Sequence, residues 1–184
     1  MNKWQVLNKK VLVQSKMFKF YQYHLKHGDK GTEHDFFILD TGDWVNIIPI
    51  TSDNKIVLVR QYRAGTDEIT IEVPGGIIDP NDEDPIVTAK RELEEETAYV
   101  TDDFEILGYV NPVPSFITNK CYFVLAKNVE KKGHIHFDPS EYIETFLASF
   151  EQVSLMVRSG QIHHSLTLNA LLFLQISGYK GFTL

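Results

Sequence analysis

The chain has 184 residues, with 18 Lys plus Arg against 25 Asp plus Glu, so its formal net charge is −7. That length predicts one compact domain with at most a small appendage. A hydrophobic fraction of 43% supplies enough apolar surface for a core, which excludes disorder along the whole chain. The acidic balance argues against a nucleic-acid partner, because neutralising phosphates requires an excess of Lys and Arg.

The sequence also argues against a membrane or secretory context. No apolar run approaches the roughly 20 residues that a membrane-spanning helix needs. The segment 1–5 lacks the apolar stretch of a secretory signal. Cys121 is the single cysteine, so no internal disulfide and no zinc–thiolate cluster are expected. Together these features predict a soluble, cytoplasmic protein without a membrane partner.

Residues 1–42 are expected to form a small antiparallel β subdomain. Polar and apolar side chains alternate in 10–13 and in 18–23, and a Gly-Asp-Lys-Gly turn at 28–31 precedes a further apolar run at 34–39. Alternation around a Gly/Asp turn is typical of a β-hairpin. Residues 43–184 are then left as the second domain.

In the second domain, apolar runs rich in β-branched residues predict strands, and Pro-Gly-Gly at 74–76 is expected to break the sheet. The predicted strands are 44–50, 55–61, 68–73, 104–110, 122–127 and 142–147. Two helices follow, one from the capping-box residue Ser149 to Gly160 and one over 166–176 with Ser165 as its N-cap. No β-α-β alternation is present, which favours an α+β or sandwich-type domain over a doubly wound sheet.

The most informative segment, 75–100, contains a further helix. Asp84 is expected to be its N-cap, and Pro85 suits the first helical position, where its missing N–H costs nothing. A helical wheel at about 100° per residue places one apolar stripe on the helix, which is expected to pack on the sheet. Its members are Ile86, Ala89, Leu93, Thr97 and Val100.

Glu92 and Glu96, four residues apart, lie beside this stripe on the same flank of the predicted helix. Carboxylates at such a seam repel each other and resist desolvation. One interpretation is an ordinary solvated acidic face. The other is a cation held between them, for which oxygen ligands without His or Cys suit Mg²⁺ or Mn²⁺. Arg91 is expected to reach Glu95 at the i+4 position.

This segment resembles the Nudix box, in which a glycine is followed at fixed spacing by a glutamate and then by Arg-Glu-aliphatic-x-Glu-Glu. The matching residues are Gly76, Arg91, Glu92, Leu93, Glu95 and Glu96. The loop is one residue longer here, which makes Glu83, rather than Asp82, the first glutamate. Ala98 replaces the glycine that ends the helix, where a left-handed conformation costs alanine about 1 kcal/mol.

The segments 45–50, 57–63, 71–76, 111–114 and 160–162 are similar to the ADP-sugar pyrophosphatase group of the Nudix family. The resemblance implies an α+β fold, a Nudix α/β/α sandwich with a mixed sheet, and a homodimer built by exchange of the N-terminal strands. It also implies Mg²⁺-dependent hydrolysis, with Mn²⁺ as a substitute, of nucleoside diphosphate sugars to a nucleoside monophosphate and a sugar 1-phosphate. ADP-ribose, other ADP-sugars and GDP-mannose are the candidate substrates.

A Nudix-fold module that binds such a nucleotide without hydrolysing it is the alternative. The chain retains Glu92, Glu95 and Glu96, which favours the enzyme, because degenerate sensors usually lose part of this set. The resemblance assigns these three glutamates and the Gly75 carbonyl as metal ligands, with Arg91 and Glu83 supporting them.

The catalytic base is expected outside the box. Glu141 is favoured over Glu144 because of its position in a loop, and Glu95 is a further catalytic candidate. Five residues are expected to contact the substrate, with Arg63 on the diphosphate: Trp44, Arg63, Glu72, Gly76 and Pro114. The aromatic residues available to stack on a base are Trp44, Phe18, Phe20, Tyr21 and Tyr23.

Four other residues complete the prediction. Asn119 stands where related enzymes carry an acidic residue, which broadens the expected substrates to nucleoside diphosphate sugars generally. The neighbours His163 and His164 cannot both face one site on a helix, so they are expected to begin the last helix on the surface. Cys121 is expected to be a small buried hydrophobe.

Overall fold

The computed structural model describes residues 2–137 and 142–184. The chain divides into two compact units. One consists of Met1–Asp43 with Val110–Lys120, and the other of Trp44–Tyr109 with Cys121–Leu184. The segment 110–120 therefore belongs to the same unit as the N-terminal strands.

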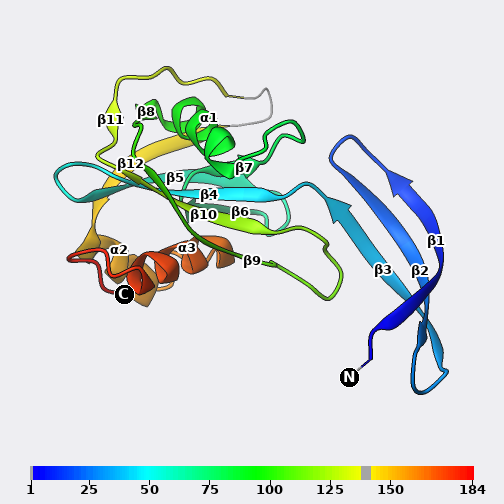
Figure 1. Ribbon diagram of the computed structural model, residues 1–184. Coiled ribbons are helices and arrows are strands. Elements are labelled where there is room, and N and C mark those ends of the chain that lie inside the picture. The colour runs from blue at the N-terminus through cyan, green and yellow to red at the C-terminus, as the bar shows by residue number, and fades with distance from the viewer. Residues whose placement is uncertain (1, 138–141) are drawn as a thin grey trace. The chain divides into compact units, whose positions relative to one another are not determined.

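The first unit is built on a three-stranded antiparallel sheet in the order β1-β2-β3, with β1 at Trp4–Gln14, β2 at Phe18–His27 and β3 at Glu33–Thr41 (Figure 1). The Gly-Asp-Lys-Gly turn joins β2 to β3, as its sequence predicts. Leu39 on β3 forms an isolated bridge with Ile117, which attaches the 110–120 segment to this sheet.

The second unit contains a seven-stranded mixed sheet in the order β12-β5-β4-β10-β9, with β6 paired to β5 and β7 paired to β4. Its strands are β4 (Trp44–Ile50), β5 (Lys55–Arg63), β6 (Glu68–Glu72), β7 (Gly75–Ile77), β9 (Phe104–Val110), β10 (Cys121–Lys127) and β12 (Ile143–Ser149). Strands β4 and β10 run parallel, whereas β5 pairs antiparallel with β6 and β12. A separate two-stranded ladder joins β8 (Tyr99–Val100) to β11 (Glu130–Lys131).

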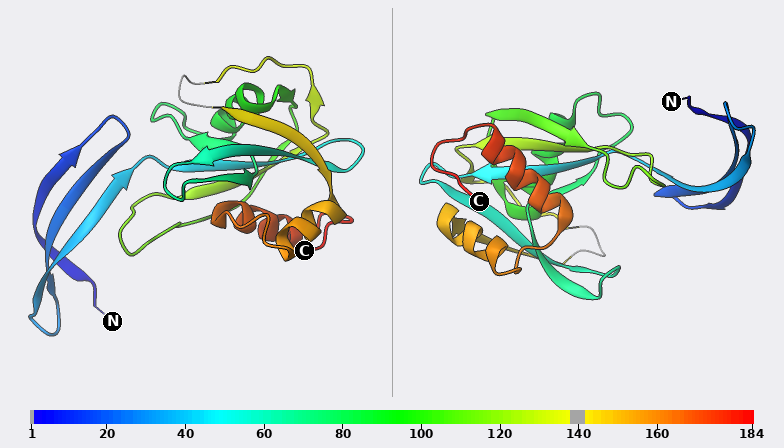
Figure 2. Two further views of the ribbon diagram at one scale, coloured as in Figure 1. Left: turned by 180° about the vertical axis from the view of Figure 1, so that it is seen from behind. Right: turned by 90° about the horizontal axis from the view of Figure 1, so that it is seen from below.

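Helices cover both faces of the mixed sheet (Figures 1 and 2). Helix α1 (Pro85–Thr97) packs over β4 and β7, and its Ala89 and Leu93 are buried with Val45 of β4. Helices α2 (Phe150–Arg158) and α3 (Ser165–Ile176) cover the opposite face, where Phe173 packs on Phe123 of β10. The predicted α/β/α sandwich with a mixed sheet and an additional N-terminal antiparallel sheet is thus confirmed. No helix in the described segments is both long enough and apolar enough to cross a membrane.

The break predicted at Pro-Gly-Gly is real but short: β6 ends at Glu72, Val73 and Pro74 lie outside any strand, and β7 begins at Gly75. Gly75 and Gly76 begin β7 and pair with Asn46 and Val45 of β4. A Cβ on Gly75 would lie 2.1 Å from the Val45 carbonyl oxygen, so this close approach of two backbones requires glycine. The two glycines of the predicted sheet breaker therefore return the chain to the sheet, and their strand packs against α1.

Local capping signals set the ends of α1 and α2 as predicted. The Asp84 side chain accepts a hydrogen bond from the Ile86 N–H at 2.9 Å, and Ser149 and Gln152 form a reciprocal capping box. Ala98 ends α1 in the left-handed conformation, with φ 60° and ψ 15°, and its N–H donates to the Glu94 carbonyl.

The start of α3 differs from the prediction by one residue. Ser165 is already helical, and His164 is the N-cap, with the extended values φ −64° and ψ 119°. The His164 side chain does not cap the helix. It turns instead toward Glu72 on β6.

Candidate active site

The two glutamates that flank the apolar stripe of α1 lie against the backbone of β7. Glu96 is only 3% exposed, and its Oε2 accepts a hydrogen bond from the Gly75 N–H at 3.1 Å. A Cβ on Gly76 would lie 2.4 Å from Oε1 of Glu92. Glycine at position 76 thus leaves the space that the Glu92 carboxylate occupies, and both carboxylates meet one short stretch of strand.

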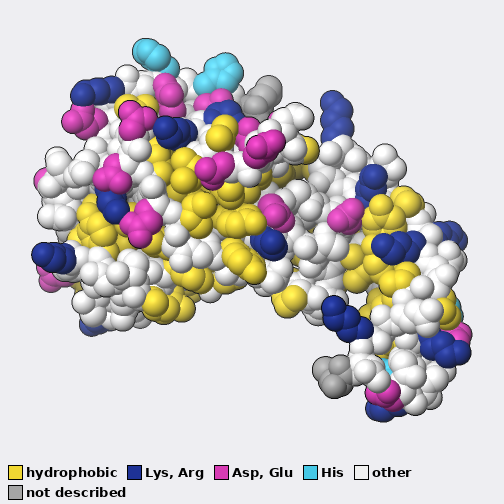
Figure 3. Space-filling view, viewed as in Figure 1, with side chains coloured by type: hydrophobic (Ala, Val, Ile, Leu, Met, Phe, Trp, Pro, Cys, Tyr) yellow, Lys and Arg dark blue, Asp and Glu magenta, His cyan; other side chains and the backbone are white. Residues whose placement is uncertain are grey.

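Arg91 organises the outer side of this acidic cluster. Its Nη1 lies 2.8 Å from Glu92 Oε1 and 3.2 Å from Glu95 Oε2. Desolvation on its own lowers the pKa of Arg91, but the charges of Glu92 and Glu95 outweigh it and raise that pKa above its ordinary value. Acidic side chains also gather over α1 and its surrounding loops in Figure 3. Arg91 therefore holds two carboxylates in place while offsetting part of their repulsion.

The donors at this cluster suit a hard divalent cation. Within residues 2–137 and 142–184, no three side chains of His, Cys, Asp or Glu come close enough to hold an ion by themselves. Mg²⁺, however, is usually held by one or two carboxylates, with substrate phosphates and water completing its shell. Glu92 and Glu96 supply the two carboxylates, and the glycine backbone beside them leaves access for further oxygen ligands.

A cavity of about 370 Å³ lies beside β7, the strand that contains Gly75 and Gly76 and is called the glycine strand below. Its volume is within the size range of small-molecule sites. Four of the five residues predicted to contact substrate line it, and so does Gly75. These residues are Trp44, Arg63, Glu72, Gly75 and Gly76. Strands β4, β5, β6 and β7 thus bring together side chains that are scattered in the sequence.

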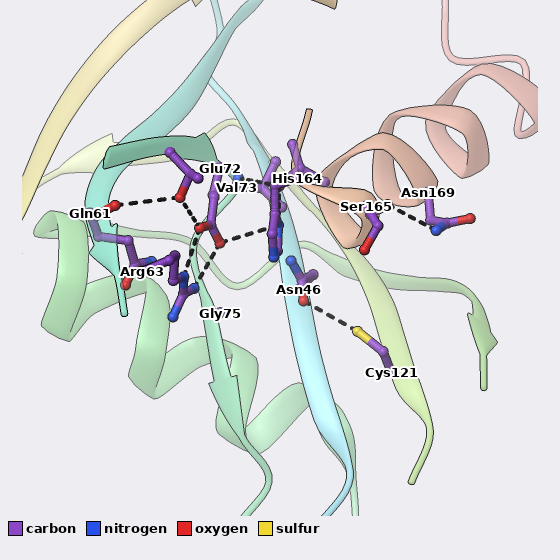
Figure 4. Close-up of polar contacts among 12 residues, drawn as sticks. Asn46, Gln61, Arg63, Glu72, Val73, Gly75, Cys121, His164, Ser165 and Asn169 are labelled. Atoms are coloured by element: carbon purple, nitrogen blue, oxygen red, sulfur yellow. Dashed lines mark hydrogen bonds and ion pairs between the residues drawn. The ribbon is translucent and has the colours of Figure 1, made fainter. Parts of the chain in front are cut away.

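Glu72 lies at the centre of the polar wall of this cavity (Figure 4). The side chain is 1% exposed, and each oxygen has two polar neighbours. Oε1 accepts from Arg63 Nε at 2.7 Å and from the Thr70 hydroxyl. Oε2 accepts from Arg63 Nη2 at 2.7 Å and lies 3.2 Å from His164 Nδ1. A carboxylate offers about four acceptor positions, so these four contacts occupy all of them and Glu72 orients its neighbours.

The charge states of this group follow from its contacts. Burial alone raises the pKa of the Glu72 carboxyl, but the hydrogen bonds and charge of Arg63, with help from Thr70, bring it below its ordinary value. Burial lowers the pKa of His164, and the nearby Glu72 only partly opposes this. Near neutral pH the group therefore contains an ionised Glu72, a charged Arg63 and an uncharged His164.

Two predicted site residues, Glu144 and Glu83, lie apart from this cavity. Glu144, on β12, is 66% exposed, forms an ion pair with Arg60 at 3.4 Å and lines a different depression. Glu83 is exposed on the loop before α1, whereas the neighbouring Asp82 accepts from the buried Thr88 hydroxyl at 2.7 Å. Pro114 belongs to the first unit. Glu141 lies outside the described residues.

Sequence reasoning missed His164. It was expected on the surface, yet its side chain is 24% exposed and lines the cavity against Glu72. His163 is the exposed member of the pair, and its ring lies 3.2 Å from Glu68. No local pattern separates the two histidines, because the contact that distinguishes them is made to a strand far away in the sequence.

Comparisons with known proteins identify the family of the chain. The family profile described as the NUDIX domain matches residues 41–167. A methanol dehydrogenase activator from Bacillus methanolicus is 34% identical over 133 residues, covering 72% of this chain and 71% of the relative. An ADP-ribose pyrophosphatase from Bacillus subtilis (strain 168) is 28% identical over 135 residues, with 72% and 71% covered. A GDP-mannose pyrophosphatase from Salmonella typhimurium is 31% identical over 153 residues, with 78% and 79% covered.

Among solved structures, a crystal structure of an ADP compounds hydrolase matches with a TM-score of 0.86 and 22% identity, over 98% of this chain and 97% of the other. At that identity the match shows a shared fold. The family profile covers most of the chain, so the chain belongs to the Nudix family. The prediction of a Nudix pyrophosphohydrolase is confirmed.

Proposed function

We propose that this Nudix protein hydrolyses the diphosphate bond of nucleoside diphosphate sugars in the presence of Mg²⁺, with Mn²⁺ as a substitute. The observation that carries the proposal is that the cavity and the acidic cluster both border the glycine strand, β7. Gly75 and Gly76 line the cavity and also lie against Glu92 and Glu96. A substrate in this cavity lies next to the acidic cluster. Relatives named ADP-ribose pyrophosphatase and GDP-mannose pyrophosphatase support the substrate class.

The acidic cluster would hold the cation. Glu92, Glu96 and the Gly75 carbonyl are the proposed ligands, with Glu95 assisting. A bound divalent cation supplies neutralisation of the diphosphate charge and activation of water. Arg91 keeps the carboxylates in position through its contacts with Glu92 and Glu95.

The cavity would hold the organic part of the substrate and one side of the diphosphate. Arg63 is the proposed contact to a phosphate oxygen, since a guanidinium oriented by Glu72 presents a fixed cationic edge. Trp44, in the apolar part of the lining, is the proposed platform for the base. The general base is proposed at Glu141, which its position in the sequence favours, or at Glu144. The resemblance also implicates Pro114 in substrate contact.

The first unit supports a proposed homodimer that exchanges N-terminal strands. Its sheet exposes apolar side chains that a partner would cover, namely Val6, Leu7, Val11, Leu12, Val13, Phe18 and Phe37. A chain with a net charge of −7 is not expected to bind nucleic acid or an anionic membrane surface, and we propose the cytoplasm as its location.

The test is a panel of ADP-ribose, ADP-glucose, GDP-mannose and UDP-glucose incubated with Mg²⁺, Mn²⁺ or excess chelator. Only diphosphate cleavage exposes phosphomonoesters, which a coupled phosphatase then releases as inorganic phosphate. We expect cation-dependent phosphate release from at least one ADP- or GDP-linked sugar. Tight binding of a panel member without turnover would favour the nucleotide-binding module instead. The absence of both binding and turnover for every panel member would refute the substrate class.

A further inference from the structure

His164, which lies outside the Nudix box, has contacts that indicate a role in binding the substrate. Its Nδ1 lies 3.2 Å from the Glu72 carboxylate and 3.1 Å from the Thr167 hydroxyl oxygen. A lone pair on Nδ1 would face a carboxylate oxygen and be repelled, so the hydrogen of the neutral ring belongs on Nδ1. The opposite nitrogen, Nε2, is then a hydrogen-bond acceptor.

Nε2 is available to a ligand. Among the described residues, no group forms a hydrogen bond with Nε2. The buried side-chain atoms without a partner in that part of the chain do not include Nε2, so this nitrogen is accessible. Because His164 lines the cavity, this acceptor opens onto the space next to Arg63. Glu72 fixes the orientation of the ring, as it fixes that of the guanidinium.

Asn46 adds a donor to the same cavity wall (Figure 4). Its Oδ1 accepts from the Cys121 thiol at 3.2 Å, which directs the other end of the amide, the Nδ2 donor, away from Cys121. Beside the guanidinium of Arg63, the cavity wall thus carries one uncharged acceptor and one uncharged donor, a pair that matches hydroxyl groups, which both donate and accept. Phosphate oxygens only accept, and so they would leave Nε2 without a partner.

We propose that His164 is a specificity-determining residue that accepts a hydrogen bond from a ribose hydroxyl of the substrate, with Asn46 donating to the same sugar. This rests on the proposed function, because the ligand is taken to be a nucleoside diphosphate sugar. The ribose belongs either to the nucleoside or to the terminal sugar. The hydroxyl chemistry is common to both sources, and the experiment separates them.

The experiment is calorimetric binding of fragments in Mg²⁺, with AMP against 2′-deoxy-AMP and ribose 5-phosphate against 2-deoxyribose 5-phosphate. His164→Asn is the informative variant, because its amide can still donate toward Glu72 from the Nδ1 position but lacks the Nε2 acceptor. His163→Asn is the matched control at the exposed neighbouring histidine. Thermal unfolding of each variant verifies that it folds.

For wild type and His163→Asn, we expect the deoxy form of the fragment that fills the cavity to bind about tenfold more weakly. In His164→Asn the two forms should bind equally. The fragment pair that shows this pattern identifies which ribose is recognised. Equal binding of both pairs by wild type, an unchanged preference in His164→Asn, or no fragment binding at all would overturn the proposal.

The outcome is separable from that of the proposed function. Hydroxyl-dependent binding that is lost in His164→Asn would support the ribose site even if no diphosphate sugar is hydrolysed. Turnover of a diphosphate sugar with no such dependence would retain the hydrolase and refute the role of His164.

Discussion

Arg63 and Glu72 meet edge to edge, with Nε and Nη2 of the guanidinium each 2.7 Å from a different carboxylate oxygen. The pair is unequal in its exposure, because Glu72 is 1% exposed and the Arg63 side chain is 44% exposed. Loss of Arg63 therefore leaves a buried anion, whereas loss of Glu72 leaves a cation that water can reach.

Removing the arginine should consequently destabilise the fold more than removing the glutamate. Arg63→Met leaves Glu72 buried without its cation, for which we expect a loss of about 3 kcal/mol at neutral pH. Glu72→Gln leaves a guanidinium that solvent can hydrate, for which we expect about 1–2 kcal/mol. Urea denaturation at pH 7 measures both. If Glu72→Gln lost as much unfolding free energy as Arg63→Met, or more, the buried Glu72 carboxylate would not be the costly partner to leave unpaired.

The same pair predicts a dependence of stability on pH. The pKa of Glu72 is lower in the folded protein than in the unfolded chain, so the unfolded chain takes up a proton first as the pH falls. The stabilisation by Glu72 is therefore fully present above the unfolded pKa of about 4.3 and is lost as the pH falls through the folded value.

The measurement is the free energy of unfolding of wild type and Glu72→Gln between pH 7 and pH 3. We expect the advantage of the wild type to be constant down to about pH 5 and to shrink below about pH 4.3. An advantage that stays constant or widens in acid would show that the carboxylate is not held in its ionised form.

The two glycines of β7 should respond differently to alanine. A Cβ at position 76 meets the movable end of Glu92, whereas a Cβ at position 75 meets the Val45 carbonyl of the neighbouring strand. Gly76→Ala should therefore fold with little loss of stability while displacing the Glu92 carboxylate, and its Mn²⁺ affinity should fall by about tenfold or more. Gly75→Ala should be destabilised by about 2 kcal/mol or more, because backbone has to shift.

Gly65→Ala is the control, since nothing lies within 4 Å of its added Cβ. Thermal unfolding and Mn²⁺ titration of all three variants give the two readouts. Unaltered Mn²⁺ binding by Gly76→Ala would remove Glu92 from the proposed cation site.

The end of α1 offers a stabilising substitution. Ala98 has φ 60°, a conformation that glycine adopts without strain, and its N–H closes the helix on Glu94. Ala98→Gly should raise the free energy of unfolding by about 0.5–1 kcal/mol, since the relieved strain exceeds the added flexibility of the unfolded chain. Chemical denaturation provides the value, and a net loss of stability would show that the alanine is unstrained there.

Features of the fold that depend on neighbours in sequence could be predicted. Asp84, Pro85 and the apolar stripe define α1, although Val100, predicted as the last member of the stripe, lies beyond the helix in β8. The Ser149 capping box defines the start of α2. The strain at Ala98 follows from one substitution in a recognisable motif. Each of these signals lies within a few residues of the structure it produces.

Contacts between distant segments could not be predicted in the same way. Gly75 and Gly76 look like a sheet breaker because the sequence does not show that β4 accepts their backbone. His164 looks like a surface residue because its contact with Glu72 exists only once α3 covers the sheet. The sequence therefore predicts local structure better than it predicts contacts between distant segments.

The most direct test of the proposed hydrolysis is the turnover of the preferred diphosphate sugar by Glu96→Gln, with Glu94→Gln as the control on the same helix. Glu96 lies against the glycine strand, whereas the Glu94 side chain contacts the backbone N–H of His134. With unfolding temperatures near that of the wild type, Glu96→Gln should lose about a hundredfold or more in kcat, and Glu94→Gln should lose little. A loss of less than about tenfold in folded Glu96→Gln would contradict an active site at this helix.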